Sequence, residues 1–298
     1  MSQQSPLFSL WSLPQPIYAF GCTLLAAYTM ANPWMEPTLL AAILMFLPFP
    51  VFLILERIKP RKKEWLLDWK DLLEDSFWVV GTYAIWLPIY SEYYDTPISR
   101  LFFSLRDSIG IDFQLAANTT GGFFLNAMIA IFAIEFIAYW LHRLQHRYMF
   151  LWRIHATHHH ITKMSVARAD RTHPLEFLGL NLSGAVAFAL LGASTEVIAV
   201  TLVFRMVTAH ICHTNLPLQS GVFGWLFNTA EWHQLHHSRD LAESNTNFGC
   251  TVIVWDRLFG TFSAKNNIDQ LGNGTGRRLS LATQLLLPFQ SNDEIRKL

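Results

Sequence analysis

Charged residues are scarce in this chain of 298 residues, because Asp, Glu, Lys and Arg together make up only 15% of it. Soluble domains usually contain about 25% charged residues. The 22 basic and 22 acidic residues cancel, so no excess of positive charge supports nucleic-acid binding. A hydrophobic fraction of 52% then indicates an integral membrane protein, folded as one unit, rather than a soluble two-domain enzyme.

Cysteine is also rare, and the three present, Cys22, Cys212 and Cys250, lie far apart in the sequence. Their spacing fits neither a disulfide framework nor a cysteine-ligated zinc or iron–sulfur site. The sequence lacks a G-x-G-x-x-G fingerprint and a P-loop. Its first residues have neither the basic region nor the cleavage site of a signal peptide. Any redox chemistry would therefore need electrons from outside the chain.

Long apolar runs are what the sequence does contain. A helix that spans a membrane needs about 20 mostly apolar residues, and six stretches meet or approach that length. They are residues 16–34, 38–56, 76–94, 120–146, 174–193 and 195–213. Apolar residues at helical spacing among charges predict amphipathic surface segments at 66–75 and 97–112. We therefore expect an all-α helical bundle with about four to six membrane-embedded helices.

Five basic residues within 57–63 follow the second apolar stretch directly. Cytoplasmic loops carry such an excess of Lys and Arg, so this loop is predicted to be cytoplasmic. Alternating crossings from that point return the ends of the stretches at 120–146 and 195–213 to the cytoplasmic side. The more polar residues from 214 onward follow on the same side. We therefore expect a cytoplasmic, histidine-rich cap on the bundle.

All twelve histidines fall between residues 142 and 237. They form four sets and one isolated residue: His142 and His146; His155, His158 and His159, with His160 adjoining; His210 and His213; His233, His236 and His237; and His173 alone. Taken singly, His173 or one H-x3-H pair would be weak grounds for a metal site. Four sets within 96 residues are much stronger grounds, because clustered imidazoles near lipid would otherwise repel one another or stay unsatisfied.

The spacing within each set has a geometric reason. Residues three or four apart share one face of an α-helix, so each set can aim two imidazoles at one point. His155 can pair with either His158 or His159, and His233 with either His236 or His237. Neutral imidazole is a good ligand for zinc, copper, iron and nickel. Eight to ten such ligands are too many for one ion and suit two.

Six sequence motifs point to a known family. They are EFIAYWLHRLQH, WRIHATHHH, THPLEFL, HTNLPL, WHQLHHSRD and NTNFGCTVIVWDRLFGTF, in that order between residues 135 and 262. Together they resemble the fatty acid hydroxylase/sterol desaturase superfamily, and the match covers about residues 120–262. The resemblance implies a catalytic domain in 120–262, and the chain around it is expected to hold membrane spans and interfacial helices in 1–119 and a tail in 263–298.

What the resemblance implies chemically is a membrane-embedded oxygenase with two iron ions. The implied metal ligands are His142, His146, His155, His158, His159, His233, His236 and His237, with His213 and its companion His210 in the box before the last. His160 leaves the register of the second box open. His173 and Glu135 are each an additional ligand or a residue that holds a ligand in place. No catalytic residue is predicted beyond these ligands.

The substrate that the resemblance implies is a lipid such as a sterol or fatty acyl chain, which is hydroxylated or desaturated with O₂. The electrons would come from an external donor of the ferredoxin, cytochrome b5 or reductase type. Such a reaction needs a dry apolar pocket. The aromatic and small residues of 120–141 and 174–209 either line that pocket or simply pack the helices together. Asp256 is either a carboxylate partner of the imidazoles or, as we favour, one half of a structural ion pair with Arg257. Two alternatives remain, a zinc-dependent membrane hydrolase and a non-catalytic metal or haem carrier.

Overall fold

All regular secondary structure is helical in the part of the chain that the computed structural model describes, residues 8–272 and 276–297. The β-structure in these residues consists of isolated β-bridges, such as the one between Leu115 and Ala193. The predicted all-α class is therefore confirmed. Residues 1–7 of the predicted N-terminal region, and residues 273–275 and 298 of the predicted tail, lie outside the described residues.

The α-helices are α1 Pro14–Ala31, α2 Pro37–Phe46, α3 Pro48–Ile58, α4 Trp69–Gly81, α5 Leu87–Tyr90, α6 Thr96–Ser108, α7 Thr120–Arg147, α8 Met149–His159, α9 Leu182–Leu191, α10 Thr195–His213, α11 Ala230–His236, α12 Leu241–Ser244, α13 Val254–Leu258, α14 Leu281–Leu286 and α15 Asn292–Lys297. Two π-helical turns, Thr82–Trp86 and Ser91–Asp95, join α4, α5 and α6 into one long helical run. Short 3₁₀ turns are Leu10–Ser12, Lys63–Trp65, Val166–Arg168, Pro174–Leu178, Phe223–Trp225 and Leu287–Phe289.

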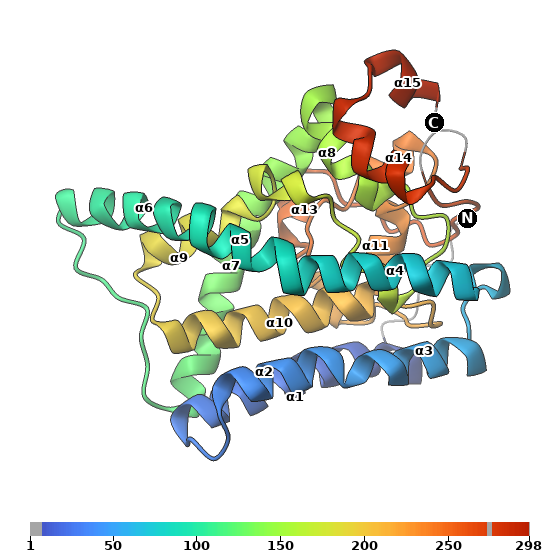
Figure 1. Ribbon diagram of the computed structural model, residues 1–298. Helices are drawn as coiled ribbons and strands as arrows, with labels where there is room; N and C mark the ends of the chain where they lie inside the picture. The colour runs from blue at the N-terminus through green and yellow to red at the C-terminus, as the bar shows by residue number, and fades with distance from the viewer. Residues whose placement is uncertain (1–7, 273–275, 298) are drawn as a thin grey trace.

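The long helices form a bundle, shown in Figure 1. Helices α1, α2 with α3, and α10 run side by side, the run from α4 to α6 lies along them, and α7 crosses them obliquely. The buried core between α1, α7 and α10 is rich in alanine and valine, including Ala26, Ala130 and Val200. Small side chains let helices approach closely, which is the usual packing of helices in membranes.

Four helical stretches are long and apolar enough to cross a membrane: Leu39–Ile58, Thr120–Arg147, Pro174–Leu191 and Thr195–His213. Each coincides with a predicted span. The predicted spans at 16–34 and 76–94 are helical but do not reach the same length and apolarity. The predicted turn near Gly192 is confirmed, because Gly192 adopts φ 56° at the end of α9 and Ser194 caps the start of α10.

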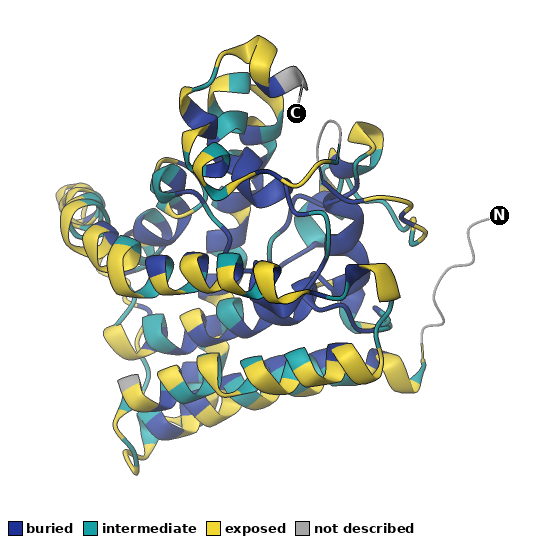
Figure 2. Ribbon diagram, turned by 45° about the vertical axis from the view of Figure 1, so that its right-hand side comes forward, coloured by how far each residue is buried: buried dark blue, intermediate teal, exposed yellow. Residues whose placement is uncertain are grey.

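The outer helices expose apolar rather than polar surface. The stretch Leu39–Ile58 has a mean hydropathy of 2.4, yet only 17% of its most apolar window is buried inside the chain. Figure 2 shows the same contrast, with exposed residues along α2 and α3 and buried residues toward the interior and the cap. Such a surface would be unfavourable in water but suits the hydrocarbon of a bilayer, and the protein is accordingly a membrane protein.

Several helix ends meet at one end of the bundle, where the histidines lie. Near the start of α1, Gln15 accepts a hydrogen bond from the backbone N–H of Ala230 (3.3 Å). In the basic loop after α3, Arg61 donates to Gln234 (2.7 Å). The C-terminal ends of α7 and α10 carry His146 and His213 to the same place. The basic loop and the histidine cap therefore lie on the same side of the bundle.

Candidate metal centre

Nine of the predicted histidines gather into two groups. The first histidine group consists of His142, His146, His155, His159 and His236, and the second histidine group consists of His158, His213, His233 and His237. Within each group, one ring nitrogen from every member lies within 4.8 Å of all the others. Eight of the nine side chains are buried, and only that of His146 is half-exposed.

The helices supply these imidazoles from their C-terminal ends. Helix α7 gives both of its histidines to the first group, since residues four apart lie on one face. The neighbours His158 and His159 end α8 and point into different groups. The neighbours His236 and His237 do the same at the end of α11. Each pair of adjacent histidines thus joins the two groups.

Backbone carbonyls fix the orientation of the imidazoles in the first group. The Nδ1–H of His142 donates to the carbonyl of Phe248, and that of His236 donates to the carbonyl of Thr246 (2.9 Å). A proton on Nδ1 leaves the Nε2 of a neutral imidazole as a bare lone pair. The two Nε2 atoms of His142 and His236 nevertheless lie 3.0 Å apart, and the Nε2 of His155 lies 2.9 Å from that of His142.

The second group repeats this arrangement. The Nδ1–H of His213 donates to the carbonyl of Ala209 (2.8 Å), and that of His158 to the carbonyl of Arg171 (3.3 Å). Their Nε2 atoms face each other at 3.4 Å, and the Nε2 of His233 lies 3.0 Å from that of His213. Again, the bare Nε2 atoms of His158 and His213 point at each other instead of at donors.

A metal ion fits both groups, because it is the partner that converging lone pairs lack. A metal–nitrogen distance of about 2.1 Å puts neighbouring ligand nitrogens about 3.0 Å apart in octahedral geometry and about 3.4 Å apart in tetrahedral geometry. The observed Nε2 separations of 2.9 to 3.4 Å match those values. The donor set consists of neutral nitrogen, which suits zinc, copper, iron and nickel.

Burial keeps these imidazoles in the form that binds metal. It lowers the pKa of five histidines of the cap well below the ordinary range, and the neighbouring imidazoles lower it further. These are His158, His159, His233, His236 and His237. The side chains are therefore neutral at physiological pH, as ligation requires.

Three predicted residues lie outside both groups. His210 faces the carboxylate of Asp170 through its Nε2 (3.2 Å). His173 caps the turn Pro174–Leu178, and its Nδ1 accepts a hydrogen bond from Leu175 N–H (3.0 Å). Glu135 is fully buried and accepts a hydrogen bond from Thr251 N–H (2.7 Å). His160, whose register was open, is also buried but belongs to neither group.

The structure assigns one carboxylate and one amide to particular histidines of the first group. Glu176 lies 3.5 Å from His155 Nδ1, and its other oxygen accepts a hydrogen bond from Gln145 (2.7 Å). Asn245 accepts a hydrogen bond from His146 Nδ1 (3.2 Å). Such partners hold a ligand ring in place, and their mutation typically lowers metal affinity by about 10–100-fold.

Asp256 does not pair with Arg257, so the expected ion pair is wrong. Its carboxylate accepts hydrogen bonds from the backbone N–H groups of Phe248 and Gly249 (both 2.8 Å) and from the Thr261 hydroxyl (2.7 Å). Burial raises the pKa of Asp256 to about 6. Asp256 thus holds the loop whose Phe248 carbonyl orients His142, whereas Arg257 donates to the carbonyl of Gly224 (2.9 Å).

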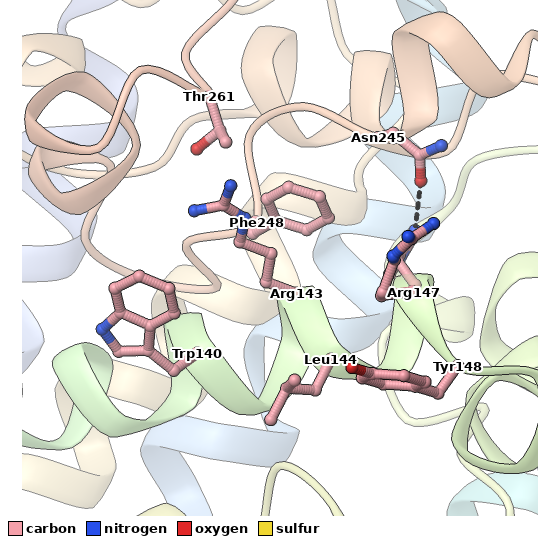
Figure 3. Close-up of a pocket in the computed structure, with 9 residues that line it drawn as sticks. Trp140, Arg143, Leu144, Arg147, Tyr148, Asn245, Phe248 and Thr261 are labelled. Carbon is pink, nitrogen blue, oxygen red and sulfur yellow. Dashed lines mark hydrogen bonds between the residues drawn. The ribbon is translucent and has the colours of Figure 1, made fainter.

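A cavity of about 450 Å³ lies beside the first histidine group, lined by Trp140, Arg143, Leu144, His146, Arg147, Tyr148, Asn245, Phe248 and Thr261. Figure 3 shows the end of α7 on one side of it and the loop carrying Asn245 and Phe248 on the other. The expected pocket was apolar and lay around 120–141 and 174–209. This cavity instead carries two arginines, and α7 and the loop form its walls.

Comparison with known proteins adds an independent observation. The model of the family described as "Fatty acid hydroxylase" matches residues 127–261. The chain is 36% identical over 139 residues to the ornithine lipid hydroxylase OlsE of Rhizobium tropici, which is 45% of this chain and 41% of that protein. It is 30% identical over 135 residues to the alkylglycerol monooxygenase of Xenopus tropicalis, covering 45% and 30%.

A third relative is a very-long-chain aldehyde decarbonylase of Oryza sativa, 29% identical over 151 residues, or 49% of this chain and 58% of the relative. The matches thus span between 30% and 58% of the length of these relatives, less than two thirds of each. No solved structure matches the chain significantly. In all three cases the matched region is long enough to hold the histidine boxes, which lie between residues 142 and 237.

Proposed function

Because the chain belongs to the fatty acid hydroxylase family through residues 127–261, we propose that it is a membrane-embedded oxygenase. Its substrate is a lipid, and its reaction is hydroxylation, or desaturation, of a C–H bond with O₂. The relatives named hydroxylase and monooxygenase support this reaction class. The region from 120 to 262 forms the catalytic unit, with membrane helices in 1–119 and a tail in 263–298.

The observation that carries the proposal is the pair of histidine groups with inward-facing bare nitrogens. We propose that each group holds one iron ion. The ligands are His142, His146, His155, His159 and His236 for one ion and His158, His213, His233 and His237 for the other. When bound, the iron pair would supply the reduction of O₂ and the removal of hydrogen from the lipid.

The chain's own residues have three tasks in this proposal. The histidines bind the ions, and Glu176 and the carbonyl of Phe248 orient the rings of His155 and His142. Burial of the cap keeps bulk water away from the ions. His210, His173 and Glu135 lie outside the ligand shells and support the loops around them.

The electrons come from a separate donor of the ferredoxin, cytochrome b5 or reductase type, since the sequence has no motif for a redox cofactor of that kind. We also propose that the metal centre faces the cytoplasm. The basic loop at 57–63 touches the cap through Arg61 and Gln234, and basic loops are retained on the cytoplasmic side. The C-terminal helix α15 lies on the same side as the cap. A fluorescent reporter fused after it should therefore be located in the cytoplasm and fluoresce there.

Mass spectrometry of lipid extracts tests the reaction. Cells that express the chain are compared with cells that express His236→Ala, both supplied with heavy-isotope O₂. We expect one lipid to gain a single oxygen atom, labelled from O₂, only with the unaltered chain. Loss of two hydrogens would indicate desaturation instead. A product whose oxygen comes from water, or an equal product from the His236→Ala variant, would contradict the proposal.

A further inference from the structure

The cavity beside the first histidine group contains positive charge that the proposed reaction alone does not explain. It contains two arginines one helical turn apart, Arg143 and Arg147. Neither forms an ion pair with a carboxylate within the described residues 8–272 and 276–297. A cavity wall with two uncompensated positive charges is a place for a negatively charged ligand.

Arg143 is held ready for such a ligand. Its guanidinium lies over the ring of Trp140 (5.4 Å), and one of its N–H groups donates to the Tyr139 hydroxyl (3.2 Å). An arginine has five N–H donors, so the remaining donors can reach an anion in the cavity. In Figure 3 the side chain extends from α7 into the space between Trp140 and Thr261. Because it is already oriented, less side-chain entropy is lost when a ligand binds.

The position of the cavity indicates where the ligand comes from. Along α7, the large side chains of Phe136, Trp140 and Leu144 are spaced four residues apart and are 40%, 39% and 40% exposed. They form an exposed apolar stripe on a helix that is apolar enough to cross a membrane, and Trp140 and Leu144 also line the cavity. Tyr148 continues the stripe at the helix end. Trp and Tyr mark the boundary between hydrocarbon and head groups, so the arginines lie at the level of the lipid head groups.

The cavity also touches the metal centre. His146, the one half-exposed member of the two histidine groups, lines it. Phe248, a buried residue that also lines the cavity, packs against the rings of His142 and His146, with ring centroids 5.7 and 5.2 Å apart. Anything bound between the arginines and this wall therefore lies against the first histidine group.

We propose that this cavity binds the head group of an acidic lipid, one that bears a phosphate or a carboxylate. The anion lies between Arg143 and Arg147, and the acyl chain follows the stripe of Trp140 and Leu144 into the bilayer. This inference rests on the proposed function. It makes an acidic, amphipathic lipid the substrate class of the oxygenase, rather than a neutral sterol or hydrocarbon.

Lipid retention tests the head-group site without turnover. The purified protein is placed in nanodiscs of phosphatidylcholine with phosphatidylglycerol, and native mass spectrometry counts the lipids that remain bound. Each arginine near a membrane surface contributes about fivefold to the affinity for an acidic lipid. Arg147→Gln should therefore reduce phosphatidylglycerol retention about fivefold, and the double variant with Arg143→Gln about 25-fold. Arg277→Gln, which removes an exposed arginine outside the cavity, is the matched control and should retain phosphatidylglycerol normally.

Two results would overturn the head-group site. The first is normal retention of phosphatidylglycerol by the double variant; a raised requirement for the electron donor alongside it would make the arginines a docking surface for an acidic protein. The second is displacement of phosphatidylglycerol by millimolar inorganic phosphate, which would indicate a site for a free anion. Metal content measured on every variant shows whether the neighbouring centre is intact.

Turnover separates this inference from the proposed function. If the unaltered chain oxidises no lipid but retains phosphatidylglycerol through its arginines, the proposed reaction fails and the head-group site stands. If the double variant oxidises an acidic lipid at the normal rate, the head-group site fails and the reaction stands. Oxidation of neutral lipids alone by the unaltered chain would refute the substrate class.

Discussion

Three consecutive histidines at the end of α8 allow a direct test of the two-group arrangement. His158 belongs to the second histidine group, His159 to the first and His160 to neither, although all three are buried. Alanine at each position removes one imidazole from nearly the same place in the helix. The three variants therefore differ mainly in which group loses a nitrogen.

The expected magnitude follows from the number of ligands. Structural sites with four ligands bind zinc with a binding free energy of about 10–16 kcal/mol. One ligand therefore contributes about 3 kcal/mol, or about a hundredfold in affinity. His158→Ala leaves three imidazoles in its group, and His159→Ala leaves four in the other. We expect His158→Ala to lose one ion per chain most readily, His159→Ala to lose one less readily, and His160→Ala to keep both.

The assay is elemental analysis of protein purified without oxygen, followed by timed exposure to a chelator. Circular dichroism verifies that each variant retains its helices. The arrangement would be refuted if His160→Ala lost as much metal as His158→Ala, or if His158→Ala kept its full complement after chelation. An equal loss from all three variants would indicate that local packing, rather than group membership, controls metal binding.

Two further predictions concern the residues that position the ligands. Glu176→Gln removes the charge 3.5 Å from His155 Nδ1. It should lower the metal affinity of the first histidine group about 10–100-fold, as measured by chelator competition. Asp256→Asn tests a pH dependence. Because burial raises the pKa of Asp256 from 3.8 to about 6, the unaltered chain should lose about 2 kcal/mol of stability relative to this variant as the pH rises from 4 to 6. Thermal unfolding of both proteins across that range measures the difference, and an unchanged difference would contradict the assigned pKa.

The sequence predicted the helices and the shared site but left the partners of the histidines open. Spacing allowed His155 to pair with His158 or with His159, and the structure joins it to His159. His233 likewise joins His237 rather than His236. In an α-helix, a residue four positions on is displaced by about 40° around the axis, and one three positions on by about 60° in the other direction. His210 and His213 are three positions apart and so differ by about 60° around the axis, and only His213 joins a group.

Contacts between distant segments could not be predicted from spacing. The carbonyl of Phe248 orients His142 across 106 positions in the sequence, and Glu176 reaches His155 from a separate turn. Backbone carbonyls leave no signature in the residue types, because every residue has one. The cavity was missed for a similar reason. Arg143 and Arg147 look like an ordinary basic helix end until the loop with Phe248 closes over them.

The adjacent pairs of histidines also connect the two histidine groups to each other. Neighbouring side chains on a helix point about 100° apart, so the ends of α8 and α11 each contribute one imidazole to each group. The rings within these pairs lie 5.8 and 5.7 Å apart. An ion bound in one group would therefore fix the helix ends that the other group needs, and a second ion would meet a smaller entropy cost. Titration of metal-depleted protein, followed by native mass spectrometry, should then show fewer singly loaded chains than independent binding allows. A statistical share of singly loaded chains would mean that each group forms without the other.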